Sequence, residues 1–553
     1  MLFEDLGLLF FTVLILSLLL TPLSISFAHY IGAVDHPVGR SVHAKAVPRL
    51  GGLAMALAML AGLLLFSEQG PVLHGFLAGF VMIALTGLAD DVWNIKARWK
   101  MLGQIVAALL FIEISGVTMD AFGDLFHLGE ISLSPIAAYA VTVFLIFSGI
   151  NCFNFSDGLD GLVSGVVAIM CLFIAVLAIS AQSIIIILLL VALLAAVLGF
   201  LKFNSFPAQL FMGDCGSLML GYTICTIAVS LTVVDVEHMI KPVTLGVIVA
   251  MPIIDTFWVM VRRMVQRINP ARADNTHLHH RLLALGLPHS LVVSILYIWT
   301  ALFGFLALFV KDMPEYWQAG SALLLSLLFY ALLTACEKKV IRFPSAILFS
   351  EKDEQAGREK LVKLMGHSMR LFPYVIVTGL SIPLFFADAF APDVGMMMIA
   401  LALLMAIAFP WKEHQQRSSI VYGLYYLSVF VVLWVWNSSS YALLNLDMYM
   451  IAFASLLMVW SVLKIKFKSH NEVFLTSSFE LLLIFISWFI PYIALPALDV
   501  SVALIETAKL SCLGAIPLFI ALKITLKDRP HRNKKMAIGL ILLFSLIAVR
   551  SLV

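Results

Sequence analysis

Two neighbouring stretches decide the fold of this chain: GLVSGVVAIMCLFIAVLAIS at residues 161–180 and SIIIILLLVALLAAVLGFL at residues 183–201. Neither contains a charged residue, and each is as long as the roughly 20 residues with which a helix crosses a bilayer. Similar runs recur along the 553 residues, of which 62% are apolar and only 12% charged. A soluble domain carries about 25% charged residues. The composition therefore excludes a water-soluble globule, a disordered chain and a collagen-like repeat.

Eighteen apolar runs are bounded by charged residues or by Gly and Pro clusters. Eleven precede a charged segment and lie at 6–29, 50–67, 72–89, 101–118, 135–150, 161–180, 183–201, 217–234, 242–260, 290–310 and 319–336. The other seven lie near 372–388, 394–410, 418–436, 441–463, 473–490, 502–522 and 536–552. Backbone inside a bilayer must satisfy its own hydrogen bonds, and the runs lack the alternation of barrel strands. The sequence therefore predicts an all-α polytopic membrane helical bundle of about 18 transmembrane helices.

The charged segment at residues 337–371 predicts a domain boundary. We expect an 11-helix membrane domain at 1–336, a charged cytoplasmic linker at 337–371 and a C-terminal membrane domain of about seven helices at 372–553. The loops of the first domain contain unusual polar patterns, whereas those of the second are merely basic. The chemistry is therefore expected in the first domain.

Basic residues are distributed unevenly between alternate loops. Of the 35 Lys and Arg residues, 31 lie on one side of the predicted membrane, the other side holds only Lys241, Lys311 and Arg550, and Lys509 lies inside a predicted span. This bias predicts that the basic loops are cytoplasmic and that the N-terminus lies outside. The net charge of +2 gives no indication of nucleic-acid binding. The six cysteines include no CxxC pair, so neither a disulfide framework nor a zinc site is expected.

Five polar segments lie between the apolar runs of the first domain, on its predicted cytoplasmic side. They are DHPVGRSVHAKAVPRLGG (35–52), ADDVWNIKARWK (89–100), NCFNFSDGLDGL (151–162), FMGDCGSL (211–218), and a stretch from MPIID (251–255) to HLHHRL (277–282). Together they supply oxygen ligands, which suit Mg²⁺ bound with phosphate and water, and basic side chains, which suit a pyrophosphate. The chain has no GxxxxGK(S/T) loop, which disfavours nucleotide hydrolysis of that kind. We expect a metal site for a phosphorylated substrate at the cytoplasmic surface.

The spacing inside two of these segments predicts local structure. Asn151, Asn154, Asp157 and Asp160 recur every three residues, so they cannot share one face of an intact helix. One helix should therefore end and another begin at the glycines of this motif. Asp214 lies between two glycines, which predicts a tight turn.

Each segment also has a plainer interpretation. The adjacent Asp90 and Asp91 follow an apolar run directly, and such a pair at a helix end is as often a solvated loop or a cap. The glycine-flanked Asp214 is more often a turn than a site, and the HLHH stretch is equally compatible with a loop that binds lipid headgroups. The functional interpretation is favoured because five unusual segments fall on one predicted face within the first 340 residues.

In this order the motifs resemble those of the polyprenyl-phosphate N-acetylhexosamine-1-phosphate transferases, of the bacterial WecA/TagO type in glycosyltransferase family 4. DxPxxRxxHxxxxPRxGG, the Asp pair, NxxNxxDGxDGL, GDxGS, PxxD and HxHH all lie within residues 1 to about 335, and NFSDGLDGL is the most specific part. The resemblance implies an 11-helix unit that transfers N-acetylhexosamine-1-phosphate, here GlcNAc-1-phosphate, from a UDP-sugar to undecaprenyl phosphate and releases UMP. The last seven runs have no counterpart in this pattern.

The resemblance also implies roles for the motif residues. The metal, Mg²⁺ with Mn²⁺ as the alternative, would be held by Asn154 and Asp255. Catalytic roles fall to Asp90, which is the family's candidate base, and to Asp91, Asp157 and Asp160. Substrate contacts fall to Lys100, which should bind a phosphate, to Asp214 and Arg49, and to a loop that caps the sugar nucleotide through His277, His279, His280 and Arg281.

The expected partners are a UDP-N-acetylhexosamine, undecaprenyl phosphate and membrane lipid, in a bacterial inner membrane and in the first membrane step of polysaccharide synthesis. A homodimer and partners in polysaccharide assembly stay open. Asp90 as a base competes with a positioning role, because a phosphate monoester with a second pKa near ~6 needs little help to ionise.

Two other function classes also stay open. A membrane transporter or flippase is disfavoured because the ionisable residues cluster at the predicted helix ends. A non-catalytic scaffold is disfavoured because every motif carboxylate is present. In the C-terminal part, Glu506 and Lys509 form either a structural pair or a functional site.

Overall fold

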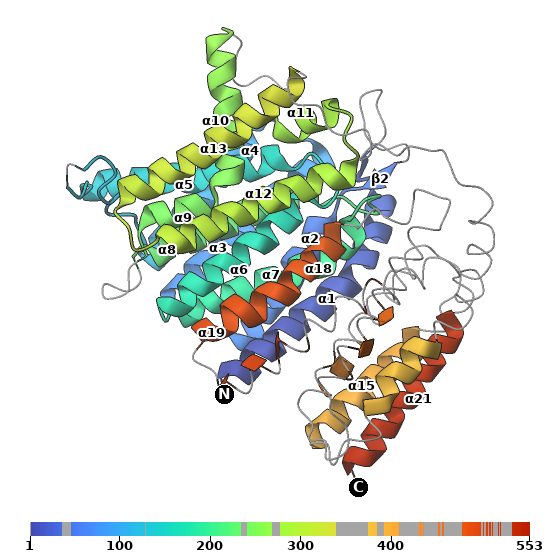
Figure 1. Ribbon diagram of the computed structural model, residues 1–553. Coiled ribbons are helices and arrows are strands. Elements are labelled where there is room, and N and C mark those ends of the chain that lie inside the picture. The colour runs from blue at the N-terminus through green and yellow to red at the C-terminus, as the bar shows by residue number, and fades with distance from the viewer. Residues whose placement is uncertain are drawn as a thin grey trace. The chain divides into compact units, whose positions relative to one another are not determined.

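The computed structural model describes residues 2–35, 46–127, 129–233, 240–267, 277–338, 374–383, 392–408, 478–498 and 533–552, with isolated positions between 428 and 457 and between 501 and 520. Nearly all of the longer described stretches are helical, which confirms the all-α class (Figure 1). The chain forms two compact units, one of Met1–Phe343 with Ser477–Leu482 and one of Pro344–Thr476 with Leu483–Val553.

The first unit contains the helices that correspond to the predicted transferase domain. They are α1 (Leu2–Ile31), α2 (Gly51–Phe66), α3 (Pro71–Trp93), α4 (Ala97–Ser115), α5 (Pro135–Ser156), α6 (Leu162–Ser180), α7 (Ile184–Asn204), α8 (Gly213–Leu231), α9 (Pro242–Ile248), α10 (Ala250–Val265), α11 (Leu278–Ala284), α12 (His289–Val310) and α13 (Glu315–Glu337). Two short strands, β1 (Val34–Asp35) and β2 (Val47–Pro48), pair antiparallel. The predicted polar residues 36–45, including Arg40, His43 and Lys45, lie outside the described residues.

Each of the eleven runs predicted before residue 337 lies on a helix. Among the described residues of the whole chain, nine helices are long and apolar enough to cross a membrane, or ten if the bent pair α9–α10 counts as one. This supports a polytopic helical membrane protein but does not confirm 18 spans.

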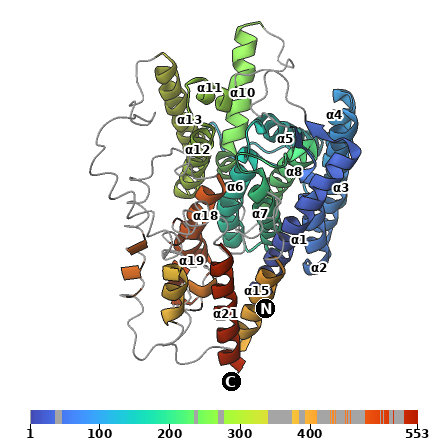
Figure 2. The same ribbon diagram turned by 90° about the vertical axis from the view of Figure 1, so that its right-hand side faces the viewer.

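The continuous span predicted at residues 242–260 is wrong. α9 and α10 meet at an angle of 80°, because Pro252 has no N–H to donate to the carbonyl of Ile248, the last residue of α9. Beyond the bend, α10 projects past the ends of the neighbouring helices (Figure 2).

The second unit is described in part. Its helices α15 (Pro392–Ala408) and α21 (Asn533–Leu552) pack against each other (Figure 1). One helical segment consists of α18 (Ser478–Phe489), η2 (Ile490–Ala494) and α19 (Leu495–Ala497). α18 lies within the predicted run near 473–490, and the segment belongs partly to each unit. Most of the predicted linker 337–371 and of the runs near 418–436, 441–463 and 502–522 lies outside the described residues.

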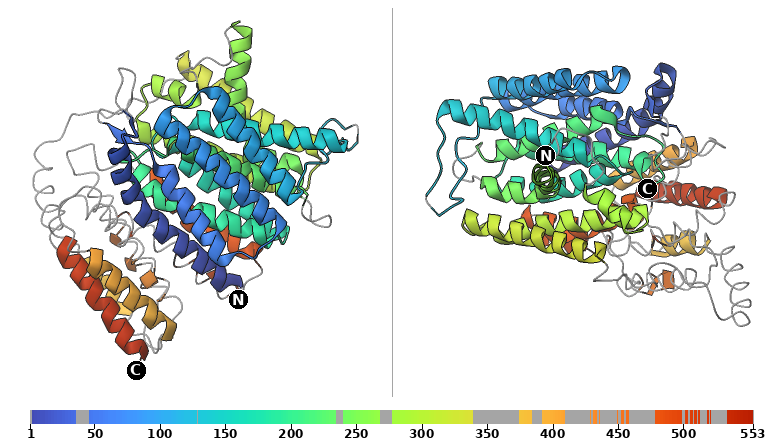
Figure 3. Two further views of the ribbon diagram at one scale, coloured as in Figure 1. Left: turned by 180° about the vertical axis from the view of Figure 1, so that it is seen from behind. Right: turned by 90° about the horizontal axis from the view of Figure 1, so that it is seen from above.

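α8 is the helix that organises the first unit. It is one of the two most deeply buried spans and packs on α2, α3 and α5. Seen from behind, the N-terminal helices, drawn in blue, face the viewer (Figure 3). Glycines allow these close approaches, because a Cβ at Gly52 would overlap the backbone of Gly216, and one at Gly87 would overlap the backbone of Cys215. Small residues at helix contacts serve the same purpose in other membrane bundles. The end of α3 and the starts of α2 and α8 therefore meet closely.

Candidate active site

Asp91 caps the N-terminus of α8. The helix begins at Gly213, whose φ is 69°, and its first backbone N–H groups have no partner within the helix. Oδ1 of Asp91 accepts a hydrogen bond from the N–H of Asp214 at 2.8 Å, and Oδ2 accepts one from the N–H of Cys215 at 2.9 Å. Asp91 is only 3% exposed. Both of its oxygens are therefore occupied by backbone, and the residue holds α8 against α3.

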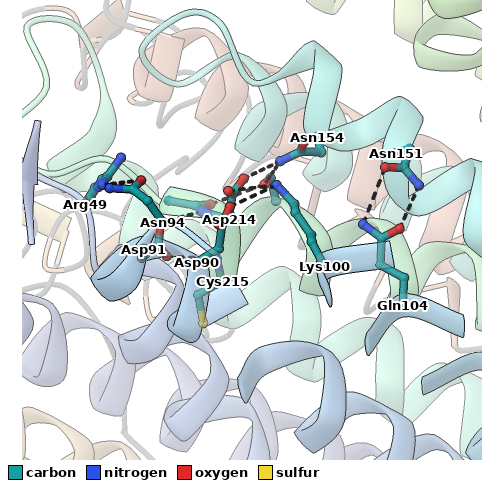
Figure 4. A network of polar contacts seen from close by, with 12 residues as sticks. Arg49, Asp90, Asp91, Asn94, Lys100, Gln104, Asn151, Asn154, Asp214 and Cys215 are labelled. Atoms are coloured by element: carbon teal, nitrogen blue, oxygen red, sulfur yellow. Dashed lines mark hydrogen bonds and ion pairs between the residues drawn. The ribbon is translucent and has the colours of Figure 1, made fainter. Parts of the chain in front are cut away.

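The capped turn places the Asp214 carboxylate beside three polar side chains (Figure 4). Nζ of Lys100, in the first turn of α4, lies 2.7 Å from Oδ2 of Asp214 and 3.3 Å from Oδ2 of Asp90. Oδ1 of Asp214 accepts a hydrogen bond from Nδ2 of Asn154, near the end of α5, at 2.6 Å. We name Asp90, Lys100, Asn154 and Asp214 the charged cluster. Its Lys and Asp side chains are 15–27% exposed, so a ligand can reach them.

A pair of amide side chains lies one helical turn from the charged cluster. Nδ2 of Asn151 donates to Oε1 of Gln104 at 2.9 Å, and Nε2 of Gln104 donates back to Oδ1 of Asn151 at 3.4 Å. Gln104 is fully buried. Because it follows Lys100 by four residues while Asn151 precedes Asn154 by three, the amide pair fixes the register of α4 against α5. It thereby sets where the lysine lies relative to the asparagine of the cluster.

One helix ends and another begins within NCFNFSDGLDGL, which confirms the prediction. α5 ends at Ser156, Gly161 has a φ of 76°, and α6 begins at Leu162. Oδ2 of Asp160 accepts a hydrogen bond from the backbone N–H of Ala208 at 2.9 Å. Asp160 therefore holds the loop between α7 and α8, as Asp91 holds the start of α8.

Asp157 lies in the same break and reports the electrostatics of the site. Burial, and then the negative charges of Asp214, Asp91 and Asp160, raise the pKa of Asp157 to about 8. Burial is the larger cause, because the protein interior solvates a carboxylate poorly, and the nearby carboxylates add repulsion. Asp157 therefore lies in a buried and acidic part of the site.

Arg49 lies at the edge of the charged cluster. Nη2 of Arg49 donates to Oδ1 of Asn94 at 3.3 Å, and Asn94 ends α3 with a φ of 46°. The strand before Arg49 is fixed to the loop that leads into α8, because the N–H of Phe211 donates to the carbonyl of Pro48 at 2.8 Å. The β2–α2 junction therefore supports the same turn that Asp91 caps.

Asp255 belongs to a second network, formed by α10, α11 and α13. Its Oδ2 lies 2.9 Å from Nδ1 of His277, and its Oδ1 accepts a hydrogen bond from the N–H of Leu278 at 2.9 Å. The hydroxyl of Tyr330 lies 3.5 Å from the same Oδ1. Asp255 is 4% exposed. It therefore anchors the start of residues 277–282, which we name the histidine segment.

His279 connects this second network to the α5–α6 break. Its ring packs against Gly158, where a Cβ would overlap Nε2. Burial, and then the neighbouring His280, His277 and His289, lower the pKa of His279 to about 3, so the ring is neutral at pH 7. Its buried Nε2 has no hydrogen-bond partner among the described residues. The histidine segment therefore holds one neutral ring nitrogen without a partner among the described residues, beside the Asp157–Gly158 turn.

The predicted metal ligands do not lie in one network. Asn154 bonds to Asp214 and to Ser217, whereas Asp255 bonds to the histidine segment. Both oxygens of Asp255 contact the histidine segment, and both oxygens of Asp214 contact Asn154 or Lys100. No group of three or more His, Cys, Asp and Glu side chains suited to a metal is found in the part of the chain that the structure describes.

Two local predictions are corrected by the helix boundaries. Asp214 lies in the first turn of α8 and not in an isolated tight turn, because Gly213 is the residue with positive φ. α3 extends to Trp93, so Asp90 and Asp91 lie within its last turn and not after it. Consecutive residues inside a helix point in directions about 100° apart, which separates the two carboxylates.

Sequence reasoning missed several residues of these networks. Gln104 and Tyr330 lie inside apolar runs, and Glu337 was assigned to the charged linker. The available signal was a polar side chain within a predicted span, which is expected to be functional or to have a partner. Asn94 carried no such signal, because its role depends on the left-handed end of α3.

Comparison with known proteins identifies the family. Residues 73–232, which contain the whole charged cluster, match glycosyl transferase family 4. A probable undecaprenyl-phosphate N-acetylglucosaminyl 1-phosphate transferase of Bacillus subtilis is 33% identical over 312 residues, which cover 55% of this chain and 84% of that protein. A decaprenyl-phosphate N-acetylglucosaminephosphotransferase of Mycolicibacterium smegmatis is 33% identical over 304 residues, covering 50% of this chain and 74% of that protein.

A more distant relative covers a similar share of the chain. An undecaprenyl-phosphate alpha-N-acetylglucosaminyl 1-phosphate transferase of Yersinia pestis is 26% identical over 337 residues, covering 60% of this chain and 91% of that protein. The motifs, the helical bundle and these similarities agree, and the chain belongs to glycosyl transferase family 4.

Proposed function

We propose that this protein transfers GlcNAc-1-phosphate from UDP-GlcNAc to undecaprenyl phosphate and releases UMP, as the first membrane step of cell-surface polysaccharide synthesis. The observation that carries the proposal is the charged cluster, in which four helices bring Lys100, two carboxylates and an amide to the N-terminus of α8. The names of the Bacillus subtilis and Yersinia pestis relatives support the transferred group and the lipid acceptor.

The chemistry requires two anions to meet. An oxygen of the acceptor phosphate attacks the phosphorus of the sugar-linked phosphate, one P–O bond forms, and the P–O bond to the departing UMP breaks. Lys100 supplies positive charge where charge accumulates, and the N-terminal end of α8 adds the positive end of a helix dipole. Asp90 and Asp214 hold the lysine in place through contacts of 3.3 and 2.7 Å. Positioning and electrostatic stabilisation are the main contributions in phosphoryl transfer generally.

The donor set of the charged cluster fits Mg²⁺. Asp90 and Asp214 would hold the ion and would then share their carboxylates between it and Lys100. Mg²⁺ commonly takes one or two carboxylates and completes its shell with phosphate oxygens and water. The acidity of the surroundings supports this fit, because the carboxylates of Asp214, Asp91 and Asp160 add to the effect of burial on the pKa of Asp157. When bound, the ion would neutralise phosphate oxygens of the donor.

We further propose that the site faces the cytoplasm from a bacterial inner membrane, with the N-terminus outside. The support is the charge bias of the predicted topology, which assigns 31 of the 35 Lys and Arg residues to the side of the five polar segments. A UDP-sugar is a cytoplasmic metabolite in this scheme, and the acceptor phosphate lies at the same surface.

Purified full-length protein in detergent should release UMP from UDP-GlcNAc when undecaprenyl phosphate and Mg²⁺ are present. UDP-GalNAc and UDP-glucose, assayed beside it, test the identity of the sugar. Omission of undecaprenyl phosphate controls for hydrolysis of the donor. UMP release that does not depend on the lipid phosphate, or no release above the background of Asp214→Asn, would contradict the proposed function.

Asp90→Asn is expected to lower kcat by about 10²-fold at every pH between 6.5 and 8.5. The reason is that Asp90 holds Lys100, and misplacement of a catalytic group by about 1 Å costs about this factor. A general base would behave differently, because the acceptor phosphate ionises by itself above its second pKa of about 6. Initial rates across this pH range decide between the two roles. A defect that disappears at pH 8.5 would restore Asp90 as the base.

A further inference from the structure

Arg281 is held in place by the end of another helix. Nε of Arg281, in α11, donates to Oε1 of Glu337 at 2.8 Å, and Nη2 donates to Oε2 at 2.8 Å. Glu337 is the last residue of α13. The guanidinium also lies over the ring of Tyr330, two helical turns before Glu337 on the same face of α13, with 5.7 Å between Cζ and the ring centroid. Two parallel hydrogen bonds to one carboxylate fix the orientation of the planar guanidinium.

Tyr330 joins this ion pair to the second network of the site. Its ring stacks on Trp258 of α10 at 4.5 Å, and its hydroxyl lies 3.5 Å from Oδ1 of Asp255. Asp255 in turn bonds to the start of the histidine segment that contains Arg281. Asp255 therefore holds the start of the helix that carries the arginine, and Glu337 holds its guanidinium.

The ion pair uses only part of the guanidinium. Glu337 takes the Nε–H and one N–H of Nη2, and the other three N–H groups have no hydrogen-bond partner among the described residues. The Arg281 side chain is 13% exposed, whereas that of Glu337 is 34% exposed. An arginine oriented on one edge by a carboxylate presents its other edge in a fixed direction, and a phosphate is the ligand that this edge binds best.

We propose that Glu337 is a positioning residue for the sugar-nucleotide donor. It orients Arg281 before the donor arrives. Binding of the donor's diphosphate to the unpaired N–H groups then costs little additional side-chain entropy. The inference rests on the proposed function, because it takes the donor to be a UDP-sugar bound beside the histidine segment. It assigns a role to a residue that terminates the last helix of the transferase unit and lies outside the motifs noted in the sequence.

Glu337→Gln should raise KM for UDP-GlcNAc about tenfold while kcat and KM for undecaprenyl phosphate change less than about twofold. Glutamine has one acceptor oxygen where glutamate has two, so the fork is lost while the side-chain size is kept. Glu315→Gln, in the first turn of the same helix, is the matched control and should leave all three values unchanged. An unchanged KM for UDP-GlcNAc in Glu337→Gln would overturn the inference. So would a fall in kcat together with equal rises in the KM values of both substrates.

A charge exchange separates positioning from a purely structural role. Arg281→Glu combined with Glu337→Arg keeps an ion pair between α11 and α13 but places a carboxylate where the arginine edge faces the donor. We expect the double variant to have the Tm of the wild type, and its KM for UDP-GlcNAc to be at least tenfold higher than that of the wild type. Recovery of both Tm and donor KM would show that the pair only joins two helices. An inactive wild type overturns the proposed function itself, whereas an active wild type with an unaffected Glu337→Gln overturns this inference alone.

Discussion

Asp214→Asn is expected to lower kcat/KM by about 10³-fold, the effect of losing one strong electrostatic contact in a preorganised site. Asp214 is the centre of the charged cluster, since one oxygen lies 2.7 Å from Nζ of Lys100 and the other accepts the 2.6 Å hydrogen bond from Asn154. Asparagine keeps an acceptor for Asn154 but removes the charge that holds Lys100. It also removes one of the two proposed Mg²⁺ ligands. UMP release at increasing Mg²⁺ concentration measures the effect.

The matched control for this substitution is Asp120→Asn. Asp120 is an exposed residue of the loop between α4 and α5, and its carboxylate accepts a hydrogen bond from Thr118 at 2.8 Å. It lies beyond the opposite end of α4 from Lys100, so its rate should stay within about twofold of the wild type. The Tm of Asp214→Asn should also stay close to that of the wild type, because the backbone cap by Asp91 is untouched. More than a tenth of wild-type activity in Asp214→Asn would remove this residue from the centre of the mechanism.

Asp91→Ala is expected to destabilise the folded protein by about 3 kcal/mol and to abolish activity along with it. The alanine leaves the N–H groups of Asp214 and Cys215 buried without acceptors, and each such group costs about 1–3 kcal/mol. Loss of a helix cap alone costs about 0.5–2 kcal/mol. Activity falls because the first turn of α8, which aims the Asp214 carboxylate, is no longer held. Thermal unfolding in detergent, followed beside UMP release, measures both effects.

Asp91→Asn provides a graded version of the same test. It keeps one acceptor oxygen and turns an amide N–H₂ toward the second backbone N–H, so its loss of Tm should lie between those of the wild type and Asp91→Ala. The contrast with Asp90→Asn is informative, because that neighbour should lose rate while its Tm is kept. If Asp91→Ala keeps the wild-type Tm and loses all activity, Asp91 acts on the substrate and not on α8.

Much of the helical framework was predictable, because hydropathy is a property of each local stretch. The run predicted at 161–180 is α6 at Leu162–Ser180, and the helix break in NCFNFSDGLDGL falls where the three-residue spacing places it. The bend between α9 and α10 was not predictable in the same way. Helices in membranes often contain Pro, and neighbouring segments decide whether the helix stays continuous. Pro252 lies in an apolar run and carries no local sign of an 80° bend.

The motifs brought together residues that the structure divides between two networks, and they did not indicate the contacts of each. The motifs singled out Asp90, Asp91, Asp160, Asp214 and Asp255 together, and nothing in the sequence separates those that bind backbone from those that face a ligand. Asp91 and Asp160 accept hydrogen bonds from backbone N–H groups of distant loops, while Asp90 and Asp214 share a lysine. These partners are up to 124 residues apart along the chain.

The sequence by itself determined that this is a helical membrane protein of one transferase family, with its unusual acids and bases at one end of the first bundle. Those conclusions rest on hydropathy, charge and motif spacing, which are read along the chain. Only the tertiary structure decided which of two adjacent aspartates reaches Lys100 and which caps α8. Neighbouring side chains on a helix point about 100° apart, so their partners depend on what packs against each face. That packing is set by contacts among α3, α4, α5 and α8 that no single stretch of sequence contains.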